Sequence, residues 1–84
     1  MEKLFISQPM KGKTDEEIIH ERNVAIRRAK AVLKEDVEVI DSLSTADIAY
    51  FAVGWDKARG CEIEHAICVN CGIPTIEASI VGEE

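Results

Sequence analysis

The sequence has few aromatic residues, few basic residues and no long apolar run, and each shortage excludes a class of protein. One Trp, one Tyr and two Phe leave the core of this 84-residue chain to aliphatic side chains. The chain has 16 acidic residues against 10 basic ones, which gives a formal net charge of −6. A nucleic-acid polymer is therefore not an expected partner, because its phosphates require a basic surface. No stretch approaches the ~18 apolar residues of a membrane span, so no membrane association is expected.

The N-terminus and the cysteines predict a cytoplasmic protein. The apolar stretch within MEKLFIS is too short for a signal peptide, and a polar loop follows it at once. The three cysteines, Cys61, Cys68 and Cys71, crowd into one predicted helix. An odd number of clustered cysteines favours reduced thiols over a disulfide framework.

The hydrophobic pattern alternates between strand-like and helix-like segments. It predicts helices at about 14–34 and 60–71, and strands at 3–7, 37–40, 48–53 and 73–76. Thr14 and Glu17 have the spacing of a capping box, and Gly72 suits the left-handed residue that ends a helix. This order predicts a single α/β domain over residues 1–84. The expected fold is a small flavodoxin/Rossmann-like one with three layers, a parallel sheet of about four strands and flanking helices.

The connection between the second and third predicted strands is short. It comprises only residues 41–46, whereas a parallel crossover usually takes a dozen or more residues. Either these strands are not neighbours joined in the usual way, or the connection is atypical and lacks its crossover helix. The tail from Glu77 onward is expected to add a short strand or to fray.

The stretch DIAYFAVGWDKARGCEIE, from Asp47 to Glu64, carries the strongest functional pattern. An apolar run over 48–53 ends at Gly54, a polar loop follows, and Gly60 then opens a helix with Glu64 in its first turns. A buried strand, a loop and a helix N-terminus in this order form ligand sites in α/β folds. Glu64 is therefore a candidate nucleophile or general base; the alternative is an ordinary exposed helix residue.

These residues resemble the nucleoside 2-deoxyribosyltransferase-like family, in particular its small, uncharacterised bacterial and phage branch. The resemblance covers 3–41 and 46–76, and it rests on four motifs: the opening LFISQPMKGK, the Gly-Trp-x-x-Ala-Arg-Gly loop, Arg59-Gly60-x-x-x-Glu64 and Gly72-Ile73-Pro74. It implies an N-glycosidase or deoxyribosyltransferase acting on a deoxyribonucleoside or its monophosphate. Glu64 would attack the anomeric carbon, the base would leave, and water or another base would take the sugar.

A second carboxylate is expected to protonate the leaving base or to orient the nucleophile. Asp56 lies in the loop before Glu64, and Asp41 follows the second predicted strand; both are candidates. Asp47 is better explained as the residue that starts a strand.

The predicted ligand-binding residues come from two loops that follow strands. The first loop leads into a helix N-terminus, which favours an anionic group. Trp55, the single Trp, either stacks on a nucleobase or covers the sheet edge. Phe5, Gln8 and Ala58 stand where characterised members of the family have a Tyr, a Gly and a phosphate-contacting Ser. The full set is Phe5, Ser7, Gln8, Pro9, Met10, Lys11, Gly12, Gly54, Trp55, Arg59 and Gly60.

The last predicted helix suggests a subunit contact. Its core face is predicted at Ile63, Ala66 and Ile67, with Cys61, His65 and Cys68 roughly opposite. A small, soft stripe away from the core predicts a homodimer or a higher even oligomer. One helix face cannot surround a zinc ion tetrahedrally, so neither a metal nor a cofactor is predicted. Alternatives to an enzyme are a noncatalytic nucleotide-binding module and a dimeric interaction scaffold.

Overall fold

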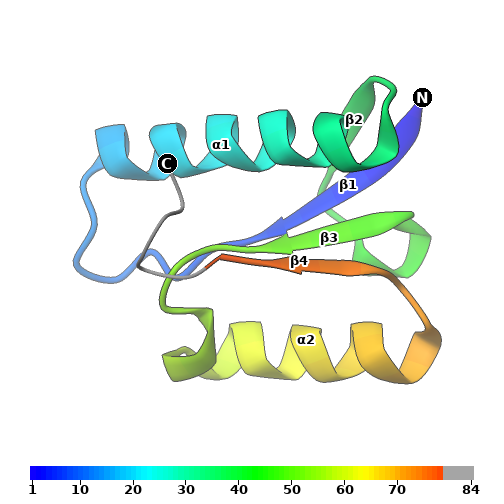
Figure 1. Cartoon of the computed structure of the whole chain (residues 1–84). Coiled ribbons are helices and arrows are strands. Elements are labelled where there is room, and N and C mark those ends of the chain that lie inside the picture. The colour runs from blue at the N-terminus through cyan, green and yellow to red at the C-terminus, as the bar shows by residue number, and fades with distance from the viewer. Residues whose placement is uncertain (79–84) are drawn as a thin grey trace.

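The computed structural model describes residues 1–78, in which a parallel sheet lies between two helices (Figure 1). The sheet has the strand order β2-β1-β3-β4, and its strands are β1 (Glu2–Ser7), β2 (Val37–Ile40), β3 (Ile48–Phe51) and β4 (Thr75–Glu77). Helix α1 (Asp15–Leu33) covers one face and helix α2 (Arg59–Cys71) covers the other. The predicted α/β fold with four parallel strands and flanking helices is thereby confirmed, and it is consistent with a small Rossmann/flavodoxin-like fold.

Strand β3 is apolar throughout because both of its faces are covered. Ile48 and Tyr50 belong to the cluster on the α1 side, whereas Ala49 and Phe51 belong to the cluster on the α2 side. All four residues are buried. Continuous burial of this kind is typical of the central strands of parallel sheets. The strand is shorter than predicted, because Val53 already lies in the turn that follows it.

Helix α1 begins and packs much as its sequence predicts. The Thr14 side chain accepts a hydrogen bond from the Glu17 backbone, and the Glu17 carboxylate accepts one from the Thr14 backbone, so the capping box is present. The helical spacing of α1 predicts an inward stripe that includes Ala25, Ala29 and Val32, and Ala25 and Ala29 are fully buried against the sheet. Val32 of the same stripe is 60% exposed, so its prediction as a core residue is wrong. It lies in the last turn at the margin of the apolar stripe, and the neighbouring Leu33 takes the position toward the core.

The strand register explains the short connection. Strand β1 lies between β2 and β3, so the two strands that the connection joins are not neighbours. Ile40, the end of β2, is level with Phe5, whereas Ile48, the start of β3, is level with Leu4. The intervening residues therefore cross β1 sideways, over about two strand spacings or ~10 Å, and need not travel along the sheet. They form the short helix η1 (Leu43–Thr45) in place of a long crossover helix.

The face of α2 that meets the sheet is the opposite of the predicted one. Cys61 and Cys68 are 6% and 0% exposed, whereas Ile63 and Ile67 are 55% and 42% exposed. The reason lies on the sheet: two aromatic rings, Phe5 and Phe51, fill the space under the helix. The two buried positions of the helix above them, Cys61 and Cys68, carry small side chains. The stripe that was predicted as a subunit contact therefore faces the sheet, and the face that was predicted to meet the sheet is exposed.

Neither helix in residues 1–78 combines the length and the apolar character that crossing a membrane requires. The strand or frayed end predicted from Glu77 onward is described only in part. Glu77 ends β4, and residues 79–84 lie outside the described part of the chain.

Candidate functional site

Glu64 projects from the second turn of α2 to the end of β1. The Ser7 hydroxyl donates a hydrogen bond to Glu64 Oε1 over 2.7 Å. Ser7 is only 2% exposed, and Glu64 is half-buried. Ser7 is level with Phe51, the last residue of β3, so the contact lies where these two parallel strands end side by side. The Glu64 carboxylate is thus held at the carboxyl edge of the sheet, the edge at which α/β folds bind ligands.

The two predicted ligand loops meet beside this edge. Gly54, at φ +91°, turns the chain after β3, and a Cβ built on it would lie 3.6 Å from Pro9 Cγ. Lys13 Nζ donates a hydrogen bond to the Val53 carbonyl over 3.2 Å. The first loop therefore packs against the loop that leads to α2, although 40 residues separate Lys13 from Val53 in the chain.

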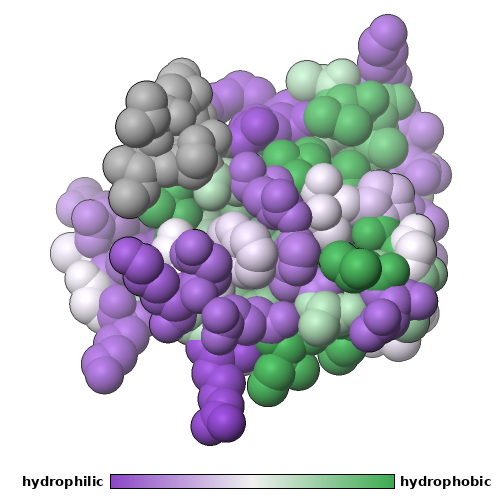
Figure 2. Space-filling model, turned by 60° about the horizontal axis from the view of Figure 1, so that its bottom comes forward, coloured by the Kyte–Doolittle hydropathy of each residue, from purple (hydrophilic) through white to green (hydrophobic). Residues whose placement is uncertain are grey.

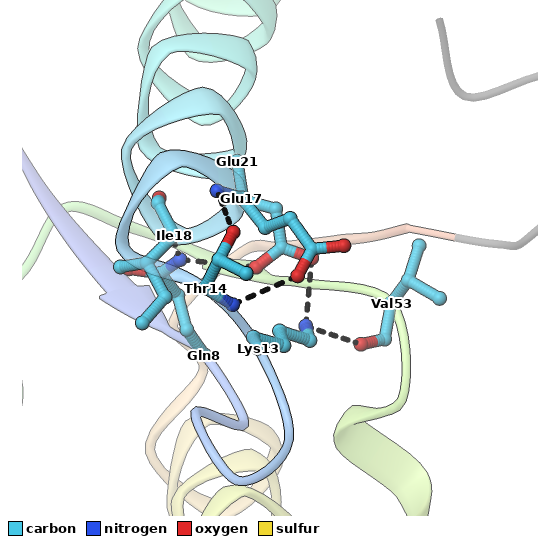
Figure 3. Close-up of polar contacts among 7 residues, drawn as sticks. All are labelled: Gln8, Lys13, Thr14, Glu17, Ile18, Glu21 and Val53. Carbon is cyan, nitrogen blue, oxygen red and sulfur yellow. Dashed lines mark hydrogen bonds and ion pairs between the residues drawn. The ribbon is translucent and has the colours of Figure 1, made fainter.

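A polar network ties the first loop to α1 and so limits which of its groups can bind a ligand (Figure 3). The Gln8 amide donates to the Ile18 carbonyl and to Glu21 Oε1, each over 3.1 Å. Lys13 Nζ lies 2.7 Å from Glu21 Oε2. These donors orient the loop. The tip of the loop, Met10 to Gly12, is exposed.

Trp55 covers the sheet edge and is packed against protein on one face. It opens the short helix η2 (Trp55–Lys57), and its indole stacks on the His65 imidazole with centroids 4.2 Å apart. Phe51 meets both rings, at 5.5 Å from Trp55 and 4.9 Å from His65. The covering role is therefore the one that the packing supports. A nucleobase cannot stack on the face that His65 occupies.

The predicted second carboxylates are exposed and do not contact Glu64. Asp56 lies in η2, and Asp41 follows β2 at the rim of a hollow of about 500 Å³. Phe5 also lines this hollow, although it is only 9% exposed and belongs to the core cluster under α2. Asp47 has the structural role expected of it, because its side chain accepts a hydrogen bond from the Lys3 backbone N–H over 2.9 Å.

The hollow beside Asp41 arises because the sheet edge is stepped. β2 ends level with Phe5, while β1 and β3 continue to Ser7 and Phe51. A second hollow, of about 380 Å³, lies on the α1 side near Glu21 and Tyr50. Glu64 lines neither of these two hollows.

The start of α2 lies one turn before Glu64. Arg59 is the first helical residue, and Ala58 before it provides no side-chain cap. Arg59 and Gly60 are exposed, and a Cβ on Gly60 would have nothing within 4 Å. A helix start with this open surface can present backbone N–H groups and the Arg59 guanidinium to an anionic group.

The cysteines of α2 do not form a metal centre. No group of three or more His, Cys, Asp or Glu side chains within residues 1–78 is arranged to hold a metal ion. Burial raises the pKa of the Cys68 thiol, and the negative charge of Glu64 and the nearby Cys71 raise it further. Cys68 is thus kept as a neutral thiol, which is a poor nucleophile and a poor metal ligand.

Comparison of the chain with protein-family models, with curated proteins and with solved structures finds no match. Two residues that the sequence did not indicate, Glu77 and Glu21, hold other side chains in place by ion pairs and hydrogen bonds. Glu77 pairs with His65, and Glu21 pairs with Lys13 and Gln8. No spacing in the sequence could indicate these pairs, because each joins different elements of the fold.

Proposed function

We propose that this protein is an N-glycosidase or deoxyribosyltransferase that acts on a deoxyribonucleoside or its monophosphate, with Glu64 as the nucleophile. The observation that carries the proposal is the contact between Ser7 and Glu64 at the carboxyl edge of the sheet. It gives the carboxylate a fixed position at the sheet edge beside which the two predicted ligand loops meet, which a solvated helix residue would not have. The family resemblance of the same residues supplies the chemistry.

In the proposed reaction a Glu64 oxygen attacks the anomeric carbon of the sugar. The bond from that carbon to the base breaks, and its electron pair leaves with the base, which takes up a proton. Asp56 and Asp41 are the candidate proton donors, acting directly or through water. The glycosyl ester on Glu64 is then opened by water, which gives hydrolysis, or by a second base, which gives transfer.

The Ser7 hydroxyl is also relevant to a position at which this chain differs from the family pattern, Phe5. Characterised members have a Tyr where this chain has Phe5, so a hydroxyl near the nucleophile is lost. Ser7 follows two residues later on the same face of β1 and brings a hydroxyl to the carboxylate. This arrangement supports a working nucleophile without the Tyr.

The direct test is incubation with a panel of deoxynucleosides and deoxynucleoside monophosphates, followed by chromatographic detection of free base. We expect release from at least one member of the panel, and a second added base distinguishes transfer from hydrolysis. Glu64→Ala is the control for a contaminating hydrolase. Tight binding of a nucleotide without release would favour the alternative of a noncatalytic binding module.

The exposed face of α2 supports the proposal that the protein is a homodimer. Figure 2 brings the α2 side forward and shows apolar side chains among the polar ones. Ile63 and Ile67 are one helical turn apart on one face of α2, and they are 55% and 42% exposed. A domain of this size buries a marginal core, and a two-fold contact would cover the same patch on both copies.

A cytoplasmic location is proposed from the free thiols Cys61, Cys68 and Cys71.

We expect Ile67→Glu to raise the dissociation constant of the dimer by 10-fold or more, because the added charge would have to be desolvated at the contact (about 1.4 kcal/mol per tenfold). Sedimentation velocity across micromolar concentrations measures the change, and Val32→Glu, an exposed apolar position on α1, is the matched control. A wild-type protein that sediments as a monomer throughout would contradict the proposal.

A further inference from the structure

Two adjacent residues of α2 reach to opposite sides of strand β3. Glu64 is bonded to Ser7 on β1, and His65 is paired with Glu77 on β4. In the sheet order, β1 and β4 are the two neighbours of β3. Successive helix residues point about 100° apart, so these two contacts together fix both the rotation of α2 and its lateral position over β3.

Several contacts hold the His65 side chain in place. Its Nε2 pairs with Glu77 Oε2, and the Thr75 hydroxyl also donates to that oxygen over 3.4 Å. The imidazole ring is stacked on Trp55 and meets Phe51 edge-on. The side chain of His65 is therefore held from three elements, β4, η2 and β3, and its exposed fraction is only 20%.

We propose that His65 and Glu77 are positioning residues for Glu64. They hold α2 at the rotation that brings the Glu64 carboxylate to Ser7, and through Trp55 they hold the loop that precedes the helix. The consequence for catalysis rests on the proposed function; the consequence for the position of Glu64 does not.

The core selects the face of α2 that meets the sheet, but it constrains the exact rotation of the helix only weakly. Two side chains of α2 are buried against the sheet, Cys61 and Cys68, and both are small. Small side chains interlock weakly with the surface below them, so the polar contacts must define the angle of the helix. Without the pair, α2 can roll over Phe51 and carry Glu64 away from Ser7. A displacement of about 1 Å at a reacting group can cost roughly 100-fold in rate.

Glu77→Ala tests the inference with little risk to the fold, because the Glu77 side chain is 46% exposed on an edge strand. His65→Gln and the double variant test whether the two residues act as a unit. Glu35→Ala, which removes an exposed carboxylate after α1, is the matched control. Two quantities are measured: the rate parameters of base release, and the NMR signal of the Glu64 carboxyl carbon, assigned by its absence in Glu64→Gln.

We expect Glu77→Ala to lower kcat by about 10- to 100-fold with little change in KM, because the chemical step depends on the position of the nucleophile. The double variant should lose no more than the single ones, and the Glu64 signal should shift in all three but not in Glu35→Ala. An unchanged Glu64 signal overturns the inference, and a shifted signal with wild-type kcat overturns its consequence for catalysis. If the wild type releases no base, the proposed function fails, and the Glu64 signal still decides the positioning.

Discussion

Replacing Glu64 with glutamine should lower base release by about 10⁴-fold or more while leaving the fold intact. The amide keeps a carbonyl oxygen that can accept the Ser7 hydrogen bond, so the side chain can stay where it is. An amide is nevertheless a very weak nucleophile, and no glycosyl ester forms on it. Single-turnover measurement of free base, with circular dichroism to show that the variant is folded, gives the comparison.

Glu62→Gln is the control, because Glu62 is an exposed carboxylate on the same helix, and its change removes the same charge. Its rate should stay close to that of the wild type. If Glu64→Gln released base at the wild-type rate, the chemistry would have to lie elsewhere, and the next candidates would be Asp56 and Asp41.

The parts of the site that the sequence predicts are those set by local order along the chain. Gly54 follows a buried strand and Arg59 opens a helix, so the loop between them had to lie at the carboxyl edge of a parallel sheet. Thr14 and Glu17 likewise cap a helix through contacts within four residues. Such features need no knowledge of how the elements pack.

The face of α2 shows where this reasoning fails. Hydrophobic periodicity assigns Ile63 and Ile67 to the core, because isoleucine is more apolar than cysteine or histidine. The choice was made instead by Phe5 and Phe51, which project from two different strands and leave little room for a large side chain at the buried positions Cys61 and Cys68. A pattern within one helix carries no information about the size of the residues that face it.

The pair formed by His65 and Glu77 was beyond prediction for a related reason. It requires β4 to lie beside β3, and α2 to be rotated so that His65 faces the sheet. The second condition is the opposite of the one that periodicity indicated. Ser7 was predicted as a ligand contact, but its hydrogen bond with Glu64 depends on the same rotation.

The largest effect on stability is expected for Cys68→Glu. Cys68 is 0% exposed and packs with Phe51 under the helix, so the new carboxylate would be buried without a partner. The negative charge of Glu64 already raises the pKa of the Cys68 thiol, so a second carboxylate there would be repelled. Burying an unpaired charge costs roughly 3–5 kcal/mol. Overpacking adds about 1–3 kcal/mol. A domain of this length has only about 4–12 kcal/mol in total.

We therefore expect Cys68→Glu to be largely unfolded at 25 °C by circular dichroism. Ile67→Glu places the same side chain one position away on the exposed face, and urea titration should find its stability within about 0.5 kcal/mol of the wild type, measured for the monomer. Comparison of these two variants decides which face of α2 belongs to the core. Had periodicity been right, Cys68→Glu would be the tolerated change and Ile67→Glu the damaging one. A folded Cys68→Glu protein that still holds Glu64 against Ser7 would contradict the packing described for this helix.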